Sequence, residues 1–444
     1  MKLLDTIKTV ANVIIIDVVY NLYLFFFIFY IKMSNYRNKN PNQHKYKDLF
    51  IKYSKDEINY FQKLDNFKKD EIFTIEKQID DYKPFNEPLR FKFLSMNTSL
   101  TNKICILRKY EDFTKLSPFS SEYSKLSKWI STISQLPLGI YKKLNHNTND
   151  ISIFLSNIRN ALDKNIYGHN ETKEQILRIL AQYISNPNAN GYVIGIQGSM
   201  GVGKTKFIKD GIGKVINYPV AFIPLGGISD SSYLKGHSYT YEGSTFGKIV
   251  EQLIKTKVMN PIFFFDELDK VSNTRYGEEI INTLIHITDN TQNDKYNDKY
   301  IEEIDLDLSK SLIFFTFNNI EKVNPILKDR MIVINIDKYL REDKLKLTKH
   351  SLLETIYKSY NFTENDVILT DDMIYYIIDN TVEEEGVRNL QRNINNIYSY
   401  INMNRYIKID DKTITFPFKV DKTFIDKYLI FKKINNDIKL SMYL

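Results

Sequence analysis

The sequence has very few of the residues that build thiol and imidazole sites. Its only cysteine is Cys105, and six histidines are spread over 444 residues. A single thiol excludes an intramolecular disulfide, a paired-cysteine redox site and a zinc ribbon, and it is compatible with a reducing compartment. No two histidines have the HExxH spacing, which excludes a metalloprotease site of that type. Any catalysis must therefore use other groups.

An excess of one charge is also nearly absent. The chain has 61 Lys and Arg against 54 Asp and Glu, a net charge of +7. This surplus is too dilute for the concentrated basic face that nucleic-acid binding needs, so we expect no nucleic-acid partner. With 26% charged and 43% hydrophobic residues the composition is typical of a globular protein. The length leaves room for two or three domains of ~150 residues.

Long apolar runs are scarce, and the longest lies near the N-terminus. Residues 10–31 (VANVIIIDVVYNLYLFFFIFYI) would span about 33 Å as a helix, enough for a bilayer core of ~30 Å, although they include Asp17. No small-residue cleavage site follows, so residues 1–33 are predicted to be an uncleaved single-pass membrane anchor. Lysine and arginine are more frequent after the segment than before it, which places the remaining chain on the cytosolic side. The alternatives are a buried helix, or a cytoplasmic protein that starts at Met33.

The next segments carry little chemical information. Residues 34–55 are polar and rich in Asn, Lys and Tyr, which predicts a linker. Apolar residues recur at helical spacing between Asp56 and Tyr82, which predicts one long amphipathic helix. We expect a helical N-terminal region over 56–154.

The pattern changes after Tyr192. Five apolar runs (YVIGIQ, PVAFIPL, PIFFFDE, SLIFFTFN and MIVINI) alternate with helical stretches, and 13 of the 16 glycines lie between Gly191 and Gly277. Such runs suit strands buried on both faces, which predicts a parallel sheet covered by helices. After Tyr339 the pattern is purely helical. The fold class is therefore α/β, with a nucleotide-binding domain at 155–338, a small α-helical lid at 339–429 and a tail at 430–444.

A phosphate-binding loop directly follows the first of these runs. It has the form GxxxxGK[ST] between a strand and a helix, which is the context that a P-loop requires. Its backbone N–H groups can wrap a phosphate, its lysine can bind the β and γ phosphates, and its threonine hydroxyl can bind Mg²⁺. The predicted ATP-binding residues are Gly198, Ser199, Met200, Gly201, Val202, Gly203, Lys204 and Thr205.

Four later residues complete a hydrolytic site. Asp266 ends an apolar strand and can hold Mg²⁺ together with Thr205, while Glu267 can polarise the attacking water. Asn318 ends another strand and can orient that water. Arg330, twelve residues later, can reach the γ-phosphate held by a neighbouring subunit.

These segments resemble the ATPase module of Lon proteases, within the AAA+ superfamily, from about Ser121 to about Leu429. The resemblance includes LGGISDSSYLKGHSYTYEGSTFGKIV, which is similar to the family's LGG-x-x-D…GH-x-x-TY-x-G run, and also PIFFFDELDK, LKDRM and EEEGVRNLQRNI. It implies a protein-remodelling homo-hexamer. It also implies roles for single residues: adenine contact for Tyr167 and Gly168, the first sensor for Asn318, the arginine finger for Arg330 and the second sensor for Arg388.

Two features depart from that family. No GPSAG-like nucleophile segment is present, and only about 38 residues follow Tyr406, fewer than the ~100 that a peptidase core needs. We therefore expect no peptide cleavage by this chain, although a separate protease is a possible partner. In the expected substrate-gripping loop, Glu242 follows Tyr241 where the family usually has an apolar residue.

The sequence thus predicts an ATPase that uses ATP and Mg²⁺ to unfold or remodel protein substrates. One alternative is a DNA-directed motor, which the acidic loop SYTYEG disfavours because it would repel phosphates. The other is a non-enzymatic, nucleotide-binding membrane scaffold, which the complete set of hydrolytic residues disfavours.

Overall fold

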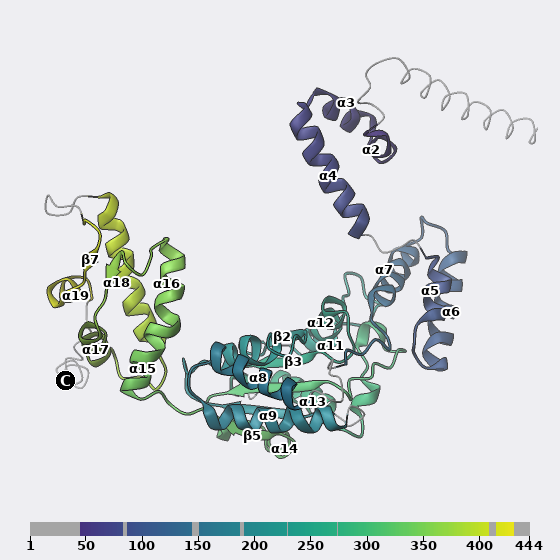
Figure 1. Ribbon diagram of the computed structural model, residues 1–444. Helices are drawn as coiled ribbons and strands as arrows, with labels where there is room; N and C mark the ends of the chain where they lie inside the picture. Colours follow the sequence, from purple (N-terminus) through teal and green to yellow (C-terminus); the bar gives the residue numbers. More distant parts are fainter. Residues whose placement is uncertain are drawn as a thin grey trace, which may run out of the picture. The chain divides into compact units, whose positions relative to one another are not determined.

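A computed structural model describes residues 45–82, 87–143, 151–186, 191–228, 230–272, 274–407 and 414–429. The chain divides into two compact units, Met1–Pro88 and Leu89–Leu444, and the labels of Figure 1 are used for their elements. The anchor predicted over residues 10–31 and the tail at 430–444 lie outside the described residues. Within the described part of the chain, no helix is both long and apolar enough to span a bilayer.

The first unit contains the helices α2 (Lys47–Lys52), α3 (Lys55–Lys63) and α4 (Asn66–Tyr82) around a small core of Tyr46, Leu49 and Phe61. The prediction of one continuous helix over 56–82 is wrong, because the chain is extended at Leu64 (φ −68°, ψ 153°). A local cap explains the break, because the Asp65 carboxylate accepts a bond of 2.8 Å from the backbone N–H of Lys68 in the first turn of α4. The preceding helix, α3, starts at a capping box formed by Ser54 and Glu57.

The second unit is built on a five-stranded sheet with the order β2-β3-β4-β1-β5 and only parallel pairs. The strands are β1 (Val193–Gln197), β2 (Val220–Pro224), β3 (Ile262–Asp266), β4 (Leu312–Phe317) and β5 (Ile332–Asn335). Each lies within one of the predicted apolar runs, so the predicted α/β fold with a parallel sheet is confirmed.

Alternate side chains of these strands pack on opposite faces of the sheet. Phe263 and Phe265 belong to one apolar cluster with α12 and α13, whereas Phe264 belongs to a second cluster with α8 and α9 (Figure 1). Burial on both faces explains why the strands are continuous apolar runs.

The helices around this sheet are α8 (Ile151–Asn165), α9 (Asn170–Ser185), α10 (Lys204–Lys206) continued by η3 (Phe207–Gly213), α11 (Ser232–Lys235), α12 (Lys248–Thr256), α13 (Arg275–Thr288) and α14 (Pro325–Asp329). Short 3₁₀ turns are η4 (Leu268–Lys270), η5 (Asn293–Lys295), η6 (Lys299–Ile301) and η7 (Ile320–Lys322).

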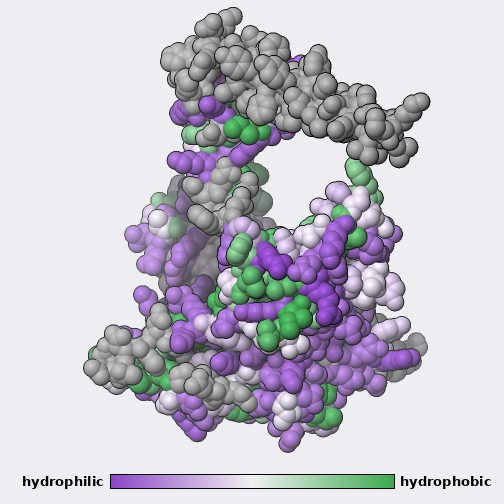
Figure 2. Space-filling view, turned by 90° about the vertical axis from the view of Figure 1, so that its right-hand side faces the viewer, coloured by the Kyte–Doolittle hydropathy of each residue, from purple (hydrophilic) through white to green (hydrophobic). Residues whose placement is uncertain are grey.

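Three helices precede this layer in the second unit: α5 (Leu89–Ser95), α6 (Leu100–Lys115) and α7 (Ser121–Gln135). Ser99 and Ser120 cap α6 and α7, and the buried Trp129 joins the apolar cluster of α12 and α13. Figure 2 looks onto the side where α5 and α6 lie in Figure 1, and hydrophobic side chains gather in the middle of that face. Exposed apolar side chains on these two helices are Phe91, Leu94, Leu100 and Ile104.

The C-terminal part of this unit is mostly helical. It contains α15 (Arg341–Leu347), η8 (Thr348–Leu352), α16 (Leu353–Tyr360), α17 (Asp371–Asn380), α18 (Arg388–Tyr406) and α19 (Lys422–Tyr428). The expectation of a purely helical region is wrong in one respect, because β6 (Val367–Ile368) and β7 (Phe418–Lys419) form a parallel pair. Strands of two residues have no periodicity to detect, and these are held by backbone bonds such as Phe418 N–H to Asp366 O at 2.8 Å.

Candidate nucleotide-binding and hydrolysis site

The phosphate-binding loop connects β1 to α10. Gly201 and Gly203 have φ values of +82° and +94°, which side chains with a Cβ rarely adopt. The loop thus turns sharply at the carboxyl edge of the sheet and continues directly into the helix that starts at Lys204. A phosphate at this point would meet backbone N–H groups and a helix N-terminus.

Lys204 lies at the centre of this loop. Its ammonium group donates to the backbone oxygens of Gly198 (2.5 Å) and Ser199 (3.0 Å) and to Oδ1 of Asn318 (2.7 Å). Burial lowers the pKa of Lys204, while the carboxylate of Asp266 acts in the opposite direction. The lysine and Asn318, predicted from separate segments, are therefore in direct contact.

Thr205 and Asp266 are also brought together. The Thr205 hydroxyl donates to one Asp266 carboxylate oxygen at 3.2 Å, and the Thr316 hydroxyl donates to the other. A hydroxyl and a carboxylate are hard oxygen ligands, which suit Mg²⁺ when phosphate and water oxygens supply the remaining positions. The described residues contain no cluster of three or more His, Cys, Asp or Glu for a metal. The donor set thus fits a magnesium ion held jointly with a nucleotide rather than by the protein alone.

Glu267 adopts a left-handed backbone conformation (φ +62°) directly after β3. Its N–H donates to the Thr316 hydroxyl at 3.2 Å. A Cβ at Gly226 would lie 2.2 Å from the Glu267 carboxylate, so a larger residue at this position would displace that side chain. Sequence reasoning missed Gly226 and Thr316. The LGG triplet at 225–227 is the one sequence signal that could have indicated Gly226.

Asp269 is a further acid that sequence reasoning missed, although it stands three residues after Asp266 in the same DELD motif. It is buried, and its Oδ2 accepts bonds from the backbone N–H groups of Asn318 (3.1 Å) and Asn319 (3.3 Å). Asp269 therefore fixes the chain that carries Asn318 at the end of β4.

The helical region closes the other side of this site. The Val387 N–H donates to Gly201 O at 3.3 Å, Ser199 donates to Glu385, and a Cβ at Gly201 would lie 3.1 Å from the Cβ of Arg388. The cavity between the phosphate-binding loop and the helical region is open to solvent on one side and has a volume of about 590 Å³. Of the predicted site residues it is lined by Met200, Gly201, Gly203, Lys204, Thr205, Asp266, Glu267, Asn318 and Arg388.

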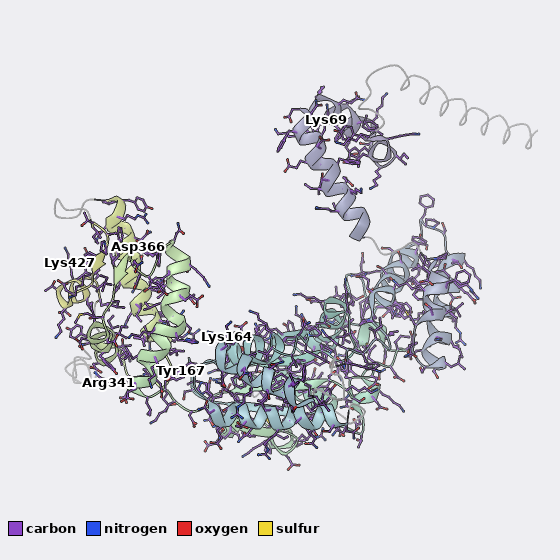
Figure 3. The ribbon with its side chains drawn as sticks, in the orientation of Figure 1. Lys69, Lys164, Tyr167, Arg341, Asp366 and Lys427 are labelled. Carbon is purple, nitrogen blue, oxygen red and sulfur yellow. The ribbon has the colours of Figure 1, made fainter. Side chains whose placement is uncertain are left out.

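Of the two predicted adenine contacts, Tyr167 lines a smaller cavity of about 30 Å³, whereas Gly168 is not among its lining residues. Tyr167 follows α8, is labelled in Figure 3, and donates to Asp343 at 3.2 Å. Gly168 has a φ of +72° and lies against the ring of Tyr339. Tyr339 lines both cavities, and its hydroxyl is 2.7 Å from Nε2 of His169. Tyr339 and His169 therefore lie beside Tyr167, which the resemblance assigns to adenine contact.

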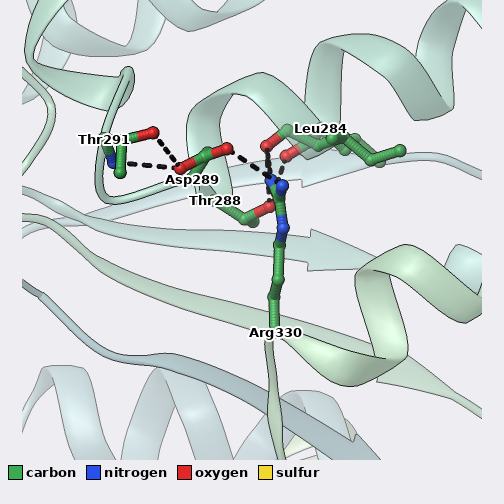
Figure 4. A network of polar contacts seen from close by, with 6 residues as sticks. Leu284, Thr288, Asp289, Thr291 and Arg330 are labelled. Carbon is green, nitrogen blue, oxygen red and sulfur yellow. Dashed lines mark hydrogen bonds and ion pairs between the residues drawn. The ribbon is translucent and has the colours of Figure 1, made fainter.

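Arg330 does not line the cavity that contains Lys204 and Asp266. It lines a separate cavity of about 390 Å³ together with Gly191, Tyr192, Asp289 and others. Figure 4 shows its guanidinium group at the end of α13, where it donates to Ile285 O at 2.6 Å and to Asp289 Oδ2 at 2.9 Å. Within one subunit, Arg330 is thus held apart from the other predicted catalytic groups.

The predicted substrate-gripping residues lie at a loop tip. Tyr241 is 70% exposed and Glu242 is also exposed. The base of this loop rests on Asp298, which is fully buried and accepts bonds of 2.8 Å from the N–H groups of Gly247 and Tyr300. Burial raises the pKa of Asp298 to about 7.

The raised pKa predicts a pH dependence of stability. In an unfolded chain the same carboxyl titrates near 4, so between about pH 4 and pH 7 the folded protein holds a proton that the unfolded chain has lost. The free energy of unfolding should therefore fall as pH rises through this window, by about 2–3 kcal/mol between pH 5 and pH 8. Thermal unfolding measured at several pH values should show that Asp298→Asn lacks this decrease in the free energy of unfolding. The control Asp294→Asn, at an exposed position, should show the same decrease as wild type. Equal pH profiles for wild type and Asp298→Asn would contradict the prediction.

Comparison with known proteins agrees with this site. Residues 194–338 match the family model described as ATPase family associated with various cellular activities (AAA). The chain is 39% identical over 254 residues to the Lon protease homolog of Acanthamoeba polyphaga mimivirus, covering 57% of this chain and 25% of that protein. It is 31% identical over 363 residues to the Lon protease of Mycoplasma genitalium (82% and 42%). The Lon protease of Fusobacterium nucleatum subsp. nucleatum is 29% identical over 365 residues (82% and 46%).

The chain therefore spans less than half the length of these curated relatives. The family match covers the phosphate-binding loop, Asp266 and Glu267 at the end of β3, and β4, which Asn318 follows. Together with the parallel sheet, it identifies residues 194–338 as an AAA module, and over the matched residues the chain is similar to Lon proteases.

Proposed function

We propose that this chain hydrolyses ATP and uses the energy to unfold or remodel protein substrates in a homo-hexameric ring. The observation that carries the proposal is the single cavity in which Lys204, Asp266, Glu267, Asn318 and Arg388 meet. In this proposal residues 155–338 are the nucleotide-binding domain and residues 339–429 are its lid. The anchor predicted over 10–31 is not part of the proposal, because it lies outside the described residues.

The residues divide the chemistry among them. Lys204 now donates to three neutral oxygens, which the charged oxygens of a β or γ phosphate can replace with stronger bonds. Thr205 and Asp266 would hold Mg²⁺, which supplies positive charge against the phosphates. Glu267 accepts a proton from the attacking water, and Asn318 orients that water beside the γ-phosphate.

The lid supplies a second positive group. Arg388 begins α18 and lines the cavity opposite Lys204. A guanidinium at this place can bind the γ-phosphate and link its presence to the position of the lid. Arg330 completes the site from the neighbouring subunit, because its own cavity is separate.

Tyr241 is proposed to transmit force to the substrate. Its exposed ring provides apolar contact with little loss of conformational entropy. Glu242 beside it would disfavour acidic segments through like-charge repulsion. Peptide cleavage is left outside the proposal, since no GPSAG-like segment occurs in the sequence.

The test of this substrate class is Tyr241→Ala in the full chain. ATP hydrolysis should stay within about twofold of wild type, because Tyr241 does not line the nucleotide cavity. Unfolding of a tagged fluorescent protein should be lost, and Tyr241→Phe should retain it. Tyr406→Ala, which removes a 74% exposed tyrosine from α18, is the matched control. Normal unfolding by Tyr241→Ala would overturn the threading of protein through this loop.

A further inference from the structure

The loop that carries Tyr241 is tied together at its base. We define the substrate loop as residues 237–246, between α11 and α12. Its ends are joined by the His237 N–H, which donates to Thr245 O at 3.1 Å. Just outside the loop, a Cβ at Gly247 would lie 2.0 Å from Leu234 O. The segments that lead into and out of the loop are therefore in close backbone contact.

The tip of the substrate loop is open to solvent. Residues 241–243 are exposed, and Gly243 has a φ of +75° with open space of at least 4 Å around the place that a Cβ would take. Two backbone bonds within the loop hold the tip, from the Tyr241 N–H to Ser238 O at 3.2 Å and from the Ser244 N–H to Tyr241 O at 3.3 Å, and the Ser238 and Thr240 hydroxyls are 3.0 Å apart. Because these bonds join residues of the loop to one another, the position of the tip against the rest of the unit depends on contacts from outside the loop.

Two lysines of α7 provide such contacts on both sides of the tip. Lys125 Nζ donates to Thr240 O at 3.0 Å, and Lys128 Nζ donates to Ser244 O at 2.8 Å. The lysines are three residues apart and therefore lie on one face of the helix. Lys125 is also 3.5 Å from Glu122, and Lys128 lies over the ring of Tyr300 at 5.9 Å.

A third lysine contacts the loop from α6. Lys109 Nζ lies 4.0 Å from the ring centre of Tyr239 and 4.6 Å from that of Trp129, and it pairs with Glu303 at 2.5 Å. Its side chain is only 14% exposed. A cation held in this way between aromatic rings fixes the start of the loop against the helices.

We propose that Lys125 and Lys128 are positioning residues for the substrate loop, and that α6 and α7 hold the loop rigid enough to pull on a substrate. A charged donor makes a stronger bond to a carbonyl than a neutral one does. The two bonds flank Tyr241 and Glu242, so force on the tip is transmitted to α7 as well as to α11 and α12. This inference deepens the proposed function and rests on it.

The test combines exchange and activity in the full chain. In Lys125→Met/Lys128→Met, the amides of His237 and Ser244 should exchange hydrogen about tenfold faster or more, because the loop loses a charged hydrogen bond on each side of its tip. The unfolding rate of a tagged protein should fall about tenfold while ATP hydrolysis without substrate stays within about twofold. Lys125→Arg/Lys128→Arg should show the exchange rate and the substrate-unfolding rate of wild type, since a guanidinium also donates to carbonyls.

The matched control is Lys115→Met, which removes an exposed lysine in the last turn of α6 that is not one of the three lysines described above. It should change neither exchange nor unfolding. Wild-type exchange in the double methionine variant would overturn the positioning role, whatever the unfolding rate. Faster exchange with an unchanged unfolding rate would overturn the role in force transmission. A failure of the proposed threading function would be recognised separately, because the Tyr241→Ala variant would then unfold the tagged protein as fast as wild type does.

Discussion

Lys204→Ala is expected to abolish ATP binding, and Glu267→Gln is expected to bind ATP without turning it over. The first change removes the half-buried ammonium group at the centre of the phosphate-binding loop. The second keeps the shape of the side chain beside Gly226 but removes the carboxylate that accepts a proton, which lowers rates by roughly 10²–10⁴. Equilibrium binding of a fluorescent ATP analogue and steady-state phosphate release measure the two effects.

Two comparisons make this result specific. Glu364→Gln changes an exposed carboxylate in the lid and should leave both measurements unchanged. Thermal unfolding of each variant shows whether the fold persists. Turnover by Glu267→Gln near the wild-type rate would assign the base to another residue, and ATP binding by Lys204→Ala would remove the phosphate-binding loop as the site.

Arg330→Ala is expected to bind ATP normally and to hydrolyse it roughly 10³–10⁵ times more slowly, which is the usual contribution of an arginine finger. ATP binding should persist because Arg330 lines a cavity separate from the nucleotide site. The large loss of rate is expected only if the guanidinium leaves Asp289 and reaches the nucleotide of the next subunit. Binding and turnover of the assembled protein measure the two parts.

Mixed rings decide whether Arg330 acts on its neighbour. Arg330→Ala subunits keep Glu267, and Glu267→Gln subunits keep Arg330, so a ring that contains both has complete sites where the two kinds adjoin. In a randomly mixed ring about a quarter of the sites are complete, and activity should return accordingly. Continued inactivity after mixing has been verified would contradict action between subunits. Asp289→Asn keeps the guanidinium of Arg330 but removes its ion pair. The hydrolysis rate of this variant shows how much of the loss in Arg330→Ala comes from a change in the local fold.

The parts of the fold that sequence analysis predicted correctly are those encoded by neighbouring residues. The five strands are apolar runs because both faces of the sheet are buried, and this signal needs no knowledge of the rest of the chain. The phosphate-binding loop and the acids after β3 have short motifs with fixed spacing. The break at Leu64 was missed because the cap formed by Asp65 was outweighed by continuous apolar periodicity.

Contacts between distant segments could not be predicted in this way. Asp269 binds backbone 49 and 50 residues later in the chain, and Gly226 makes room for Glu267 across the sheet edge. Lys128 contacts a carbonyl 116 residues away. Lysine is common on helix surfaces, so neither its type nor its spacing indicates such a partner.

The helix α13 joins two places that would serve different nucleotides in a ring. It begins shortly after Asp269, which holds the segment of Asn318, and it ends next to Asp289, which holds Arg330. Its 14 residues form a rod about 21 Å long. A displacement of Asn318 when phosphate leaves one site would move one end of this rod and, through the other end, the arginine that serves the next site. In the proposed ring, α13 would therefore link the two nucleotide sites that flank one subunit.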